Sequence, residues 1–175
     1  YHGIKNKRGR GKITVSARGA KRKNSKTAAA TQLLSFSDMT LFAERGRYTL
    51  TEAQSITMFE GLREELTKLS LGVYFAELLE NLSDEDIPNP EMLALGLNAL
   101  YALSERLRPE EIIKAAFELR LMCVAGFEPM LSACAVCGRS DIVSPTFSVT
   151  GGVVTCMKCR DAGAGEVFYL NDGTL

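Results

Sequence analysis

The sequence predicts an α+β protein built from three parts: a small β-barrel, a central group of helices and a four-cysteine module. Three observations lead there: short alternating strands near the start, leucines at helical spacing in the middle, and two Cys-x-x-Cys pairs near the end. With 175 residues, 46% of them apolar, the chain can bury a real core. The expected segments are residues 1–51, 52–127 and 128–170, with 171–175 beginning a further, truncated element.

The barrel is expected from several short strands in about fifty residues. Apolar residues alternate over residues 12–17, as in a half-buried strand. Residues 31–43 are interpreted as a strand pair or one long strand. Arg45-Gly46-Arg47 then forms a turn, and residues 48–51 a closing strand. This pattern favours a small antiparallel barrel or sheet.

Three helices are expected next. Leucines recur at helical spacing from Leu62 to Leu82. After an acidic loop over residues 83–89, Asn89-Pro90-Glu91 provides a cap, a first-turn proline and a favourably placed acid, for a helix that runs to about Leu107. Pro109-Glu110-Glu111 opens a third helix through Val124, which Gly126 ends as a left-handed cap.

Charge is distributed very unevenly, although the formal net charge is zero. Residues 1–26 hold ten basic residues and no acidic ones, which leaves 11 basic and 21 acidic residues for the rest of the chain. Such a segment indicates contact with nucleic-acid phosphates, and it would position the backbone without reading the sequence. A solvated tail is the alternative. The candidate DNA contacts are Lys5, Lys7, Arg8, Arg10, Lys12, Arg18, Lys21, Arg22, Lys23 and Lys26.

Four cysteines are spaced as metal ligands. Cys134, Cys137, Cys156 and Cys159 give the pattern C-x2-C-x18-C-x2-C, with a predicted hairpin between the two pairs. The hairpin brings the second pair back to complete a tetrahedron of thiolates at about 2.3 Å from one structural zinc ion. A pair of redox dithiols is the alternative, but that motif expects a βαβ context, which the sequence does not offer.

Several function classes find no support. No apolar run approaches the length of a membrane-spanning helix, and no signal peptide is evident. The two Cys-x-x-Cys pairs and the odd cysteine count fit a reducing cytoplasm. His2 is the only histidine, the residues around Gly11-Lys12 depart from a phosphate-binding loop, and four thiolates leave no open metal position. We therefore expect a protein that is not an enzyme.

The order of these pieces resembles the RecO family of bacterial DNA repair and recombination mediators. The segments that carry the resemblance, nearly end to end along the chain, are residues 11–26, 59–63, 117–121, 126–127, Pro129, 134–138 and 151–156. The specificity lies in their order, because each segment alone is weak. Family members have more strand before Gly11-Lys12 and continue into a further helix, so the barrel is expected to look incomplete at its N-terminus.

The resemblance implies an N-terminal OB-fold, a helical domain, and a zinc-ribbon-like module inserted in or packed on that domain. It implies binding of single- and double-stranded DNA, annealing of complementary strands, and action with RecR to load RecA onto DNA coated by single-strand binding protein. That work would take place in the cytoplasm, at the nucleoid. Arg120 would help receive the acidic tail of single-strand binding protein, although a structural ion pair is an equal alternative. A different reading is a protein-binding zinc scaffold whose basic arm contacts acidic partner tails.

Overall fold

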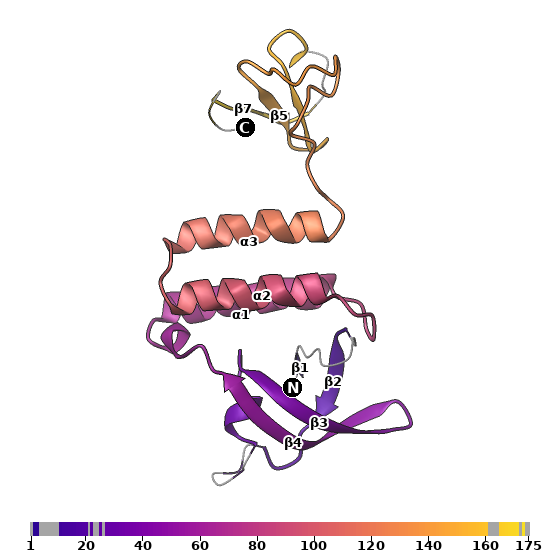
Figure 1. The fold of residues 1–175 in the computed structure, drawn as a ribbon, viewed down its shortest axis with the longest axis vertical. Helices are drawn as coiled ribbons and strands as arrows, with labels where there is room; N and C mark the ends of the chain where they lie inside the picture. The colour runs from indigo at the N-terminus through magenta and orange to yellow at the C-terminus, as the bar shows by residue number, and fades with distance from the viewer. Residues whose placement is uncertain are drawn as a thin grey trace. The chain divides into compact units, whose positions relative to one another are not determined.

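The structure is a computed structural model that describes residues 2–3, 11–20, 22, 25, 27–160, 165–171 and 173. It is an α+β protein with three α-helices and two small sheets among the described residues (Figure 1). The chain divides into two compact units, residues 1–121 and residues 122–175, which are described separately below. Of the ten candidate DNA contacts, Lys5, Lys7, Arg8, Arg10, Lys21, Lys23 and Lys26 lie outside the described residues.

The first unit contains a four-stranded sheet in the order β1-β2-β4-β3. Its strands are β1 (His2–Gly3), β2 (Ile13–Ser16), β3 (Phe36–Glu44) and β4 (Arg47–Thr57). The turn predicted around Arg45-Gly46-Arg47 is confirmed, because β3 and β4 pair as an antiparallel hairpin that closes with Glu44 opposite Arg47. The expectation of a purely antiparallel sheet is wrong at one pair, since β2 and β4 run parallel.

Two further strand predictions differ from the structure in their extent. The closing strand continues to Thr57, six residues beyond the expected Thr51. The segment expected to be extended from Thr31 instead holds a short 3₁₀ helix η1 (Ala29–Thr31) and a turn before β3 begins at Phe36. Ser35 donates to the carbonyl oxygens of Ala30 and Gln32 at 2.9 Å, which satisfies the backbone locally and competes with a strand ladder.

Three helices complete the first unit. A 3₁₀ turn η2 (Glu60–Arg63) leads into α1 (Leu66–Leu82), followed by α2 (Pro90–Ser104) and α3 (Glu110–Val124). Figure 1 shows α1 and α2 over the strands and α3 on their other side. The rings of Phe75 in α1 and Phe117 in α3 stack with centroids 4.1 Å apart, and both side chains are fully buried. Burial of such aromatic pairs joins the helices into one core.

Two of the predicted helix ends agree with the structure, and one does not. The Asn89 side chain accepts a hydrogen bond from the backbone N–H of Met92 at 3.0 Å, so the predicted cap is confirmed. Gly126 has φ of 88° directly after α3, as expected for a left-handed cap. However, α2 ends at Ser104, three residues before the expected Leu107, because Arg106 takes a left-handed conformation with φ of 53°. The sequence offers no glycine at that position.

The second unit contains a three-stranded antiparallel sheet in the order β6-β5-β7. The predicted hairpin is confirmed as β5 (Thr146–Ser148) and β6 (Val153–Thr155), with Gly152 at φ of 61° in the turn. The third strand, β7 (Val167–Tyr169), was not predicted. The N–H of Met130 donates to the carbonyl of Gly152 in the turn, and its carbonyl accepts from the N–H of Val154 in β6, so the chain before the first cysteine pair is held against the hairpin.

Candidate metal centre and nucleic-acid interface

The second unit gathers the four predicted cysteine ligands into one cluster. Cys134 and Cys137 lie in the loop before β5, and Cys156 and Cys159 follow the end of β6. Backbone hydrogen bonds fix the two pairs in register, since the N–H of Ala135 donates to the carbonyl of Val154 at 2.9 Å. The folding of the hairpin therefore brings together two pairs that are 18 residues apart in the sequence.

The spacing of the sulfur atoms fits a tetrahedral metal ion. All four Sγ atoms lie within 4.8 Å of one another, and those of Cys137 and Cys156 are 3.9 Å apart. Sulfurs around a tetrahedral ion with bonds of about 2.3 Å are separated by about 3.8 Å. The cluster can therefore hold one metal ion. The N–H of Cys156 also donates to the Sγ of Cys134 at 3.3 Å, which partly neutralises a thiolate there.

The pKa values of two of the clustered thiols differ widely. Hydrogen bonds from the backbone N–H groups of Cys137 and Cys156 lower the pKa of Cys134 to about 6. The side-chain hydrogen bond with Cys156 raises the pKa of Cys159 to about 12. These contacts therefore favour the thiolate form of Cys134 and the protonated form of Cys159. Four thiolates this close repel one another, and all four ionise together only with a cation between them.

In the first unit, Lys12 lies against one of the protein's own acidic side chains, that of Glu80. Its Nζ is 3.7 Å from the Glu80 carboxylate and 3.4 Å from the Glu80 carbonyl oxygen. The backbone there is held as well, since the N–H of Asp86 donates to the Lys12 carbonyl at 3.2 Å. A Cβ at Gly11 would overlap the backbone carbonyl of Ile87. Gly11 thus permits close approach to the loop between α1 and α2.

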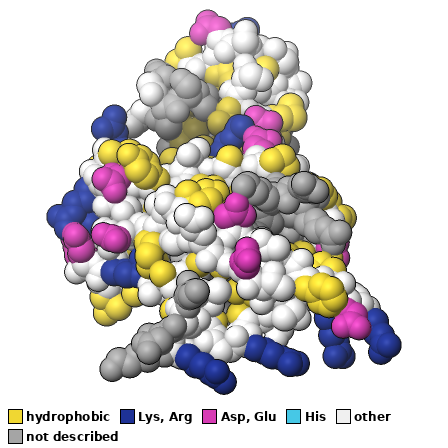
Figure 2. Space-filling view, turned by 60° about the horizontal axis from the view of Figure 1, so that its bottom comes forward, with side chains coloured by type: hydrophobic (Ala, Val, Ile, Leu, Met, Phe, Trp, Pro, Cys, Tyr) yellow, Lys and Arg dark blue, Asp and Glu magenta, His cyan; other side chains and the backbone are white. Residues whose placement is uncertain are grey.

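Arg18 and Arg22 differ from Lys12 because they lie exposed in the turn after β2. Within the described part of the chain, neither guanidinium has a hydrogen-bond or ion-pair partner. Figure 2 shows several Lys and Arg side chains along the lower edge of the space-filling view. These two arginines can therefore accept a phosphate without first losing an ion pair.

The basic residues of the helical segment are engaged instead. Every Lys and Arg between η2 and the end of α3 contacts a carboxylate or a backbone carbonyl; these residues are Arg63, Lys68, Arg106, Arg108, Lys114 and Arg120. Unengaged cations in the first unit are thus confined, among the described residues, to the sheet and its loops. The described cations without a partner in the first unit therefore lie on the sheet side and not on the helices.

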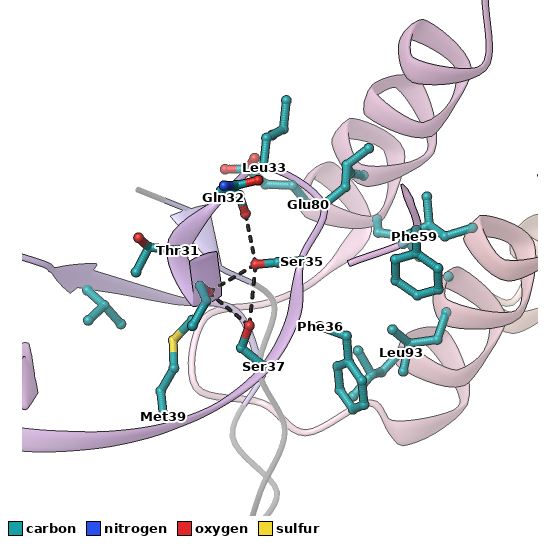
Figure 3. Close-up of a pocket in the computed structure, with 18 of the residues that line it drawn as sticks. Thr31, Gln32, Leu33, Ser35, Phe36, Ser37, Met39, Phe59, Glu80 and Leu93 are labelled. Atoms are coloured by element: carbon teal, nitrogen blue, oxygen red, sulfur yellow. Dashed lines mark hydrogen bonds between the residues drawn. The ribbon is translucent and has the colours of Figure 1, made fainter. Parts of the chain in front are cut away.

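An apolar cavity of about 510 Å³ lies between this sheet and helices α1 and α2. Figure 3 shows Phe36 and Leu93 on its wall, with Ser35 and Ser37 bonded to the turn beside it. Glu77 and Glu80 are the only ionisable side chains among the described lining residues, and Glu80 is engaged by Lys12. The lining is otherwise made of apolar and uncharged polar side chains among the described residues.

Two protein-family models match this chain. A model described as "Recombination protein O N terminal" matches residues 8–59, and one described as "Recombination protein O C terminal" matches residues 63–175. The chain belongs to the RecO family. The first match covers β2, β3 and β4 with their arginines, and the second covers the helices and the cysteine cluster.

Curated RecO proteins are similar over most of the chain. The identity is 33% to DNA repair protein RecO of Acetivibrio thermocellus, over 90% of this chain and 63% of the relative. It is 36% to that of Symbiobacterium thermophilum, again over 90% and 63%, and 35% to that of Alkaliphilus metalliredigens, over 86% and 61%. The chain thus spans about three fifths of the length of these RecO proteins.

Arg120, considered for partner binding, forms an ion pair in this RecO chain. Its Nη2 lies 2.7 Å from a carboxylate oxygen of Glu91 in α2. Glu118, two positions before Arg120 in α3, is instead bonded to Lys114 at 2.7 Å. The hydrogen bond with Lys114, and then that from Tyr74, lowers the pKa of Glu118. Arg120 is 58% exposed, so its outer edge is accessible while its charge is partnered.

Three exposed residues of the β3–β4 hairpin were not among the binding residues predicted from the sequence: Phe42, Arg45 and Arg47. They lie beyond the basic run that drew attention to residues 1–26. The signal that would have revealed them is alternation. Leu41 of β3 lines the cavity, so alternation along the strand places Phe42, the next residue, on the outer face.

No helix in the described part of the RecO chain combines the length and the apolar run that crossing a bilayer requires.

Proposed function

We propose that this chain is the DNA-binding part of a RecO recombination mediator. It would bind single- and double-stranded DNA and anneal complementary strands. With RecR it would help load RecA onto DNA coated by single-strand binding protein. The observation that carries this is the separation of cations: Arg18 and Arg22 are unengaged beside the sheet, whereas the cations of the helical segment are partnered. Family membership supports the repair context.

The proposed DNA-binding surface comprises the basic N-terminal segment and the turn after β2. Arg18 and Arg22 are its described, unengaged members, and Lys12 would contribute from within its ion pair. The remaining members are Lys5, Lys7, Arg8, Arg10, Lys21, Lys23 and Lys26. The four-stranded sheet would be part of an OB-fold, a fold whose strands and loops bind oligonucleotides.

The metal in the cysteine cluster is proposed to be a single structural zinc ion, within a zinc-ribbon-like module. Four thiolates at tetrahedral spacing suit zinc, and they leave no coordination position open to a substrate. The ion would join the loop before β5 to the end of β6, supporting a unit with little apolar core. Because such a metal site is closed to substrate, the chain would act without being an enzyme.

The partners are proposed to be RecR and single-strand binding protein, with RecA reached indirectly. The acidic tail of single-strand binding protein would contact the exposed edge of Arg120 on α3. The protein would work in the cytoplasm, associated with the nucleoid.

One observation favours a second candidate, a protein-binding zinc scaffold whose basic arm contacts acidic tails. Val136 and Met157, which lie inside the two Cys-x-x-Cys pairs, are 55% and 59% exposed. Apolar side chains displayed at both pairs suit a protein partner.

Annealing of complementary oligonucleotides, followed with and without single-strand binding protein, tests the proposal. The double variant Arg18→Ala/Arg22→Ala should anneal more slowly in both conditions because it loses two phosphate contacts. Arg120→Ala should slow annealing only when single-strand binding protein is present. A scaffold would bring neither annealing nor DNA affinity, so an inactive wild-type chain that still binds acidic peptides would overturn the first candidate.

A further inference from the structure

The outer face of the β3–β4 hairpin carries one exposed aromatic ring. Phe42 is 57% exposed, and it lies in register with Thr49 of β4, which lies in register with Ser16 of β2. A row across three strands therefore places a hydrophobic ring beside two hydroxyls. Alternation puts this row on the face opposite Leu41 and Leu50, which line the cavity.

The tip of the same hairpin carries two unengaged cations. Arg45 and Arg47 are exposed, and within the described residues neither has a hydrogen-bond or ion-pair partner. Glu44 lies in register with Arg47 but forms no ion pair with either arginine at the described side chains. The tip thus keeps a net positive charge, and Arg18 follows β2 two residues after Ser16.

The turn itself is built in an unusual way. Arg45 and Gly46 have φ of 49° and 75°, the positive values that a two-residue type I′ turn requires at both positions. Asn, Asp or Gly ordinarily occupies the first position, and a longer side chain there costs about 1 kcal/mol or more. Arginine at this position keeps a long cationic side chain at the tip of the hairpin.

We propose that this face binds single-stranded DNA, with a base stacked on Phe42 and phosphates held by Arg45 and Arg47. Every base has a flat apolar face, so stacking on a lone ring is tolerant of sequence, and guanidinium groups and hydroxyls suit the phosphates. The paired bases of a duplex cannot stack on the ring without separating. The face therefore favours single strands, as an annealing protein requires. This inference rests on the DNA binding proposed above and assigns it a second surface.

The absence of tryptophan from the chain permits a direct test. Phe42→Trp places the protein's single tryptophan on the face, and Tyr101→Trp, at a ring of similar exposure (53%) on α2, is the matched control. Titration of the full chain with oligo-dT should quench the fluorescence of the Phe42→Trp variant and leave that of the control unchanged. Duplex of equal length should quench neither.

Two affinity measurements accompany the fluorescence. Phe42→Ala should weaken oligo-dT binding by about 5- to 150-fold, the effect of losing one stacked base, with an unchanged salt slope and unchanged duplex affinity. Arg45→Gln/Arg47→Gln should instead lower the salt slope on oligo-dT by about 1.4, or about 0.7 for each lost phosphate contact. Tyr101→Ala should change none of these values.

Three results would overturn the inference. If oligo-dT binds but leaves the Phe42→Trp fluorescence unchanged, the proposed DNA binding stands and this surface is wrong. If the fluorescence changes with protein concentration in the absence of DNA, the face is an interface between copies of the chain. If the wild-type chain binds no DNA at all, the proposed function fails together with this surface.

Discussion

Loss of one cluster cysteine should weaken metal binding by a calculable amount. Structural zinc sites bind with about 10–16 kcal/mol. Shared equally among four thiolates, each is worth about 2.5–4 kcal/mol, which corresponds to roughly 10²- to 10³-fold in affinity. Cys137 is exposed, so Cys137→Ser should remove a ligand without disturbing buried packing. Its Sγ lies 3.9 Å from that of Cys156, within the same coordination sphere.

Cys123 provides the matched control for this variant. It is the one cysteine outside the cluster, in α3, so Cys123→Ser should bind zinc as the wild type does. Competition with a chromophoric chelator measures both affinities, and circular dichroism after chelation reports whether residues 128–170 keep their fold. Equal affinity of Cys137→Ser and the wild type, or an equal loss in Cys123→Ser, would refute the four-thiolate site.

Three further predictions concern the helical core. Phe117→Ala removes the ring stacked on Phe75 and should lower the free energy of unfolding by about 3–5 kcal/mol in urea denaturation. Gly61→Ala would push a methyl group into the backbone carbonyl of Ser104 and should cost about 1–3 kcal/mol, seen as a lower Tm. Because the Glu118 pKa is lowered, its stabilisation is present above the usual value of 4.5 and is lost as pH falls through the folded value. Glu118→Gln should therefore destabilise by up to about 1 kcal/mol at pH 7, and the loss should shrink as the pH falls below 4.5; a loss that stays constant as the pH is lowered would contradict this.

The features that the sequence predicted well are local ones. The cap at Asn89, the left-handed Gly126 and the hairpin between the cysteine pairs each depend on a few adjacent residues, and each is confirmed. The cysteine spacing is local in the same sense, because each pair is a single turn. Its closure then needed only the hairpin that the glycines predicted.

The features that the sequence missed depend on contacts between distant residues. Arg120 and Glu91 are 29 positions apart, and no spacing rule connects them. The parallel pairing of β2 with β4 likewise depends on contacts between residues far apart in the sequence. Arg106 ends α2 in a left-handed conformation without glycine, which propensity does not anticipate. The exposure of Phe42 followed from alternation, but only once the face lining the cavity was known.

The salt dependence of DNA binding tests the central claim most directly. On single-stranded DNA, each phosphate contact contributes about 0.7 to the slope of log affinity against log salt. Arg18→Ala/Arg22→Ala should therefore lower the slope by about 1.4, whereas Lys114→Ala/Arg120→Ala, which removes two partnered cations of the helices, should leave it unchanged. Equal losses in both double variants, or none in the first, would contradict the assignment of DNA binding to the sheet side of this RecO chain.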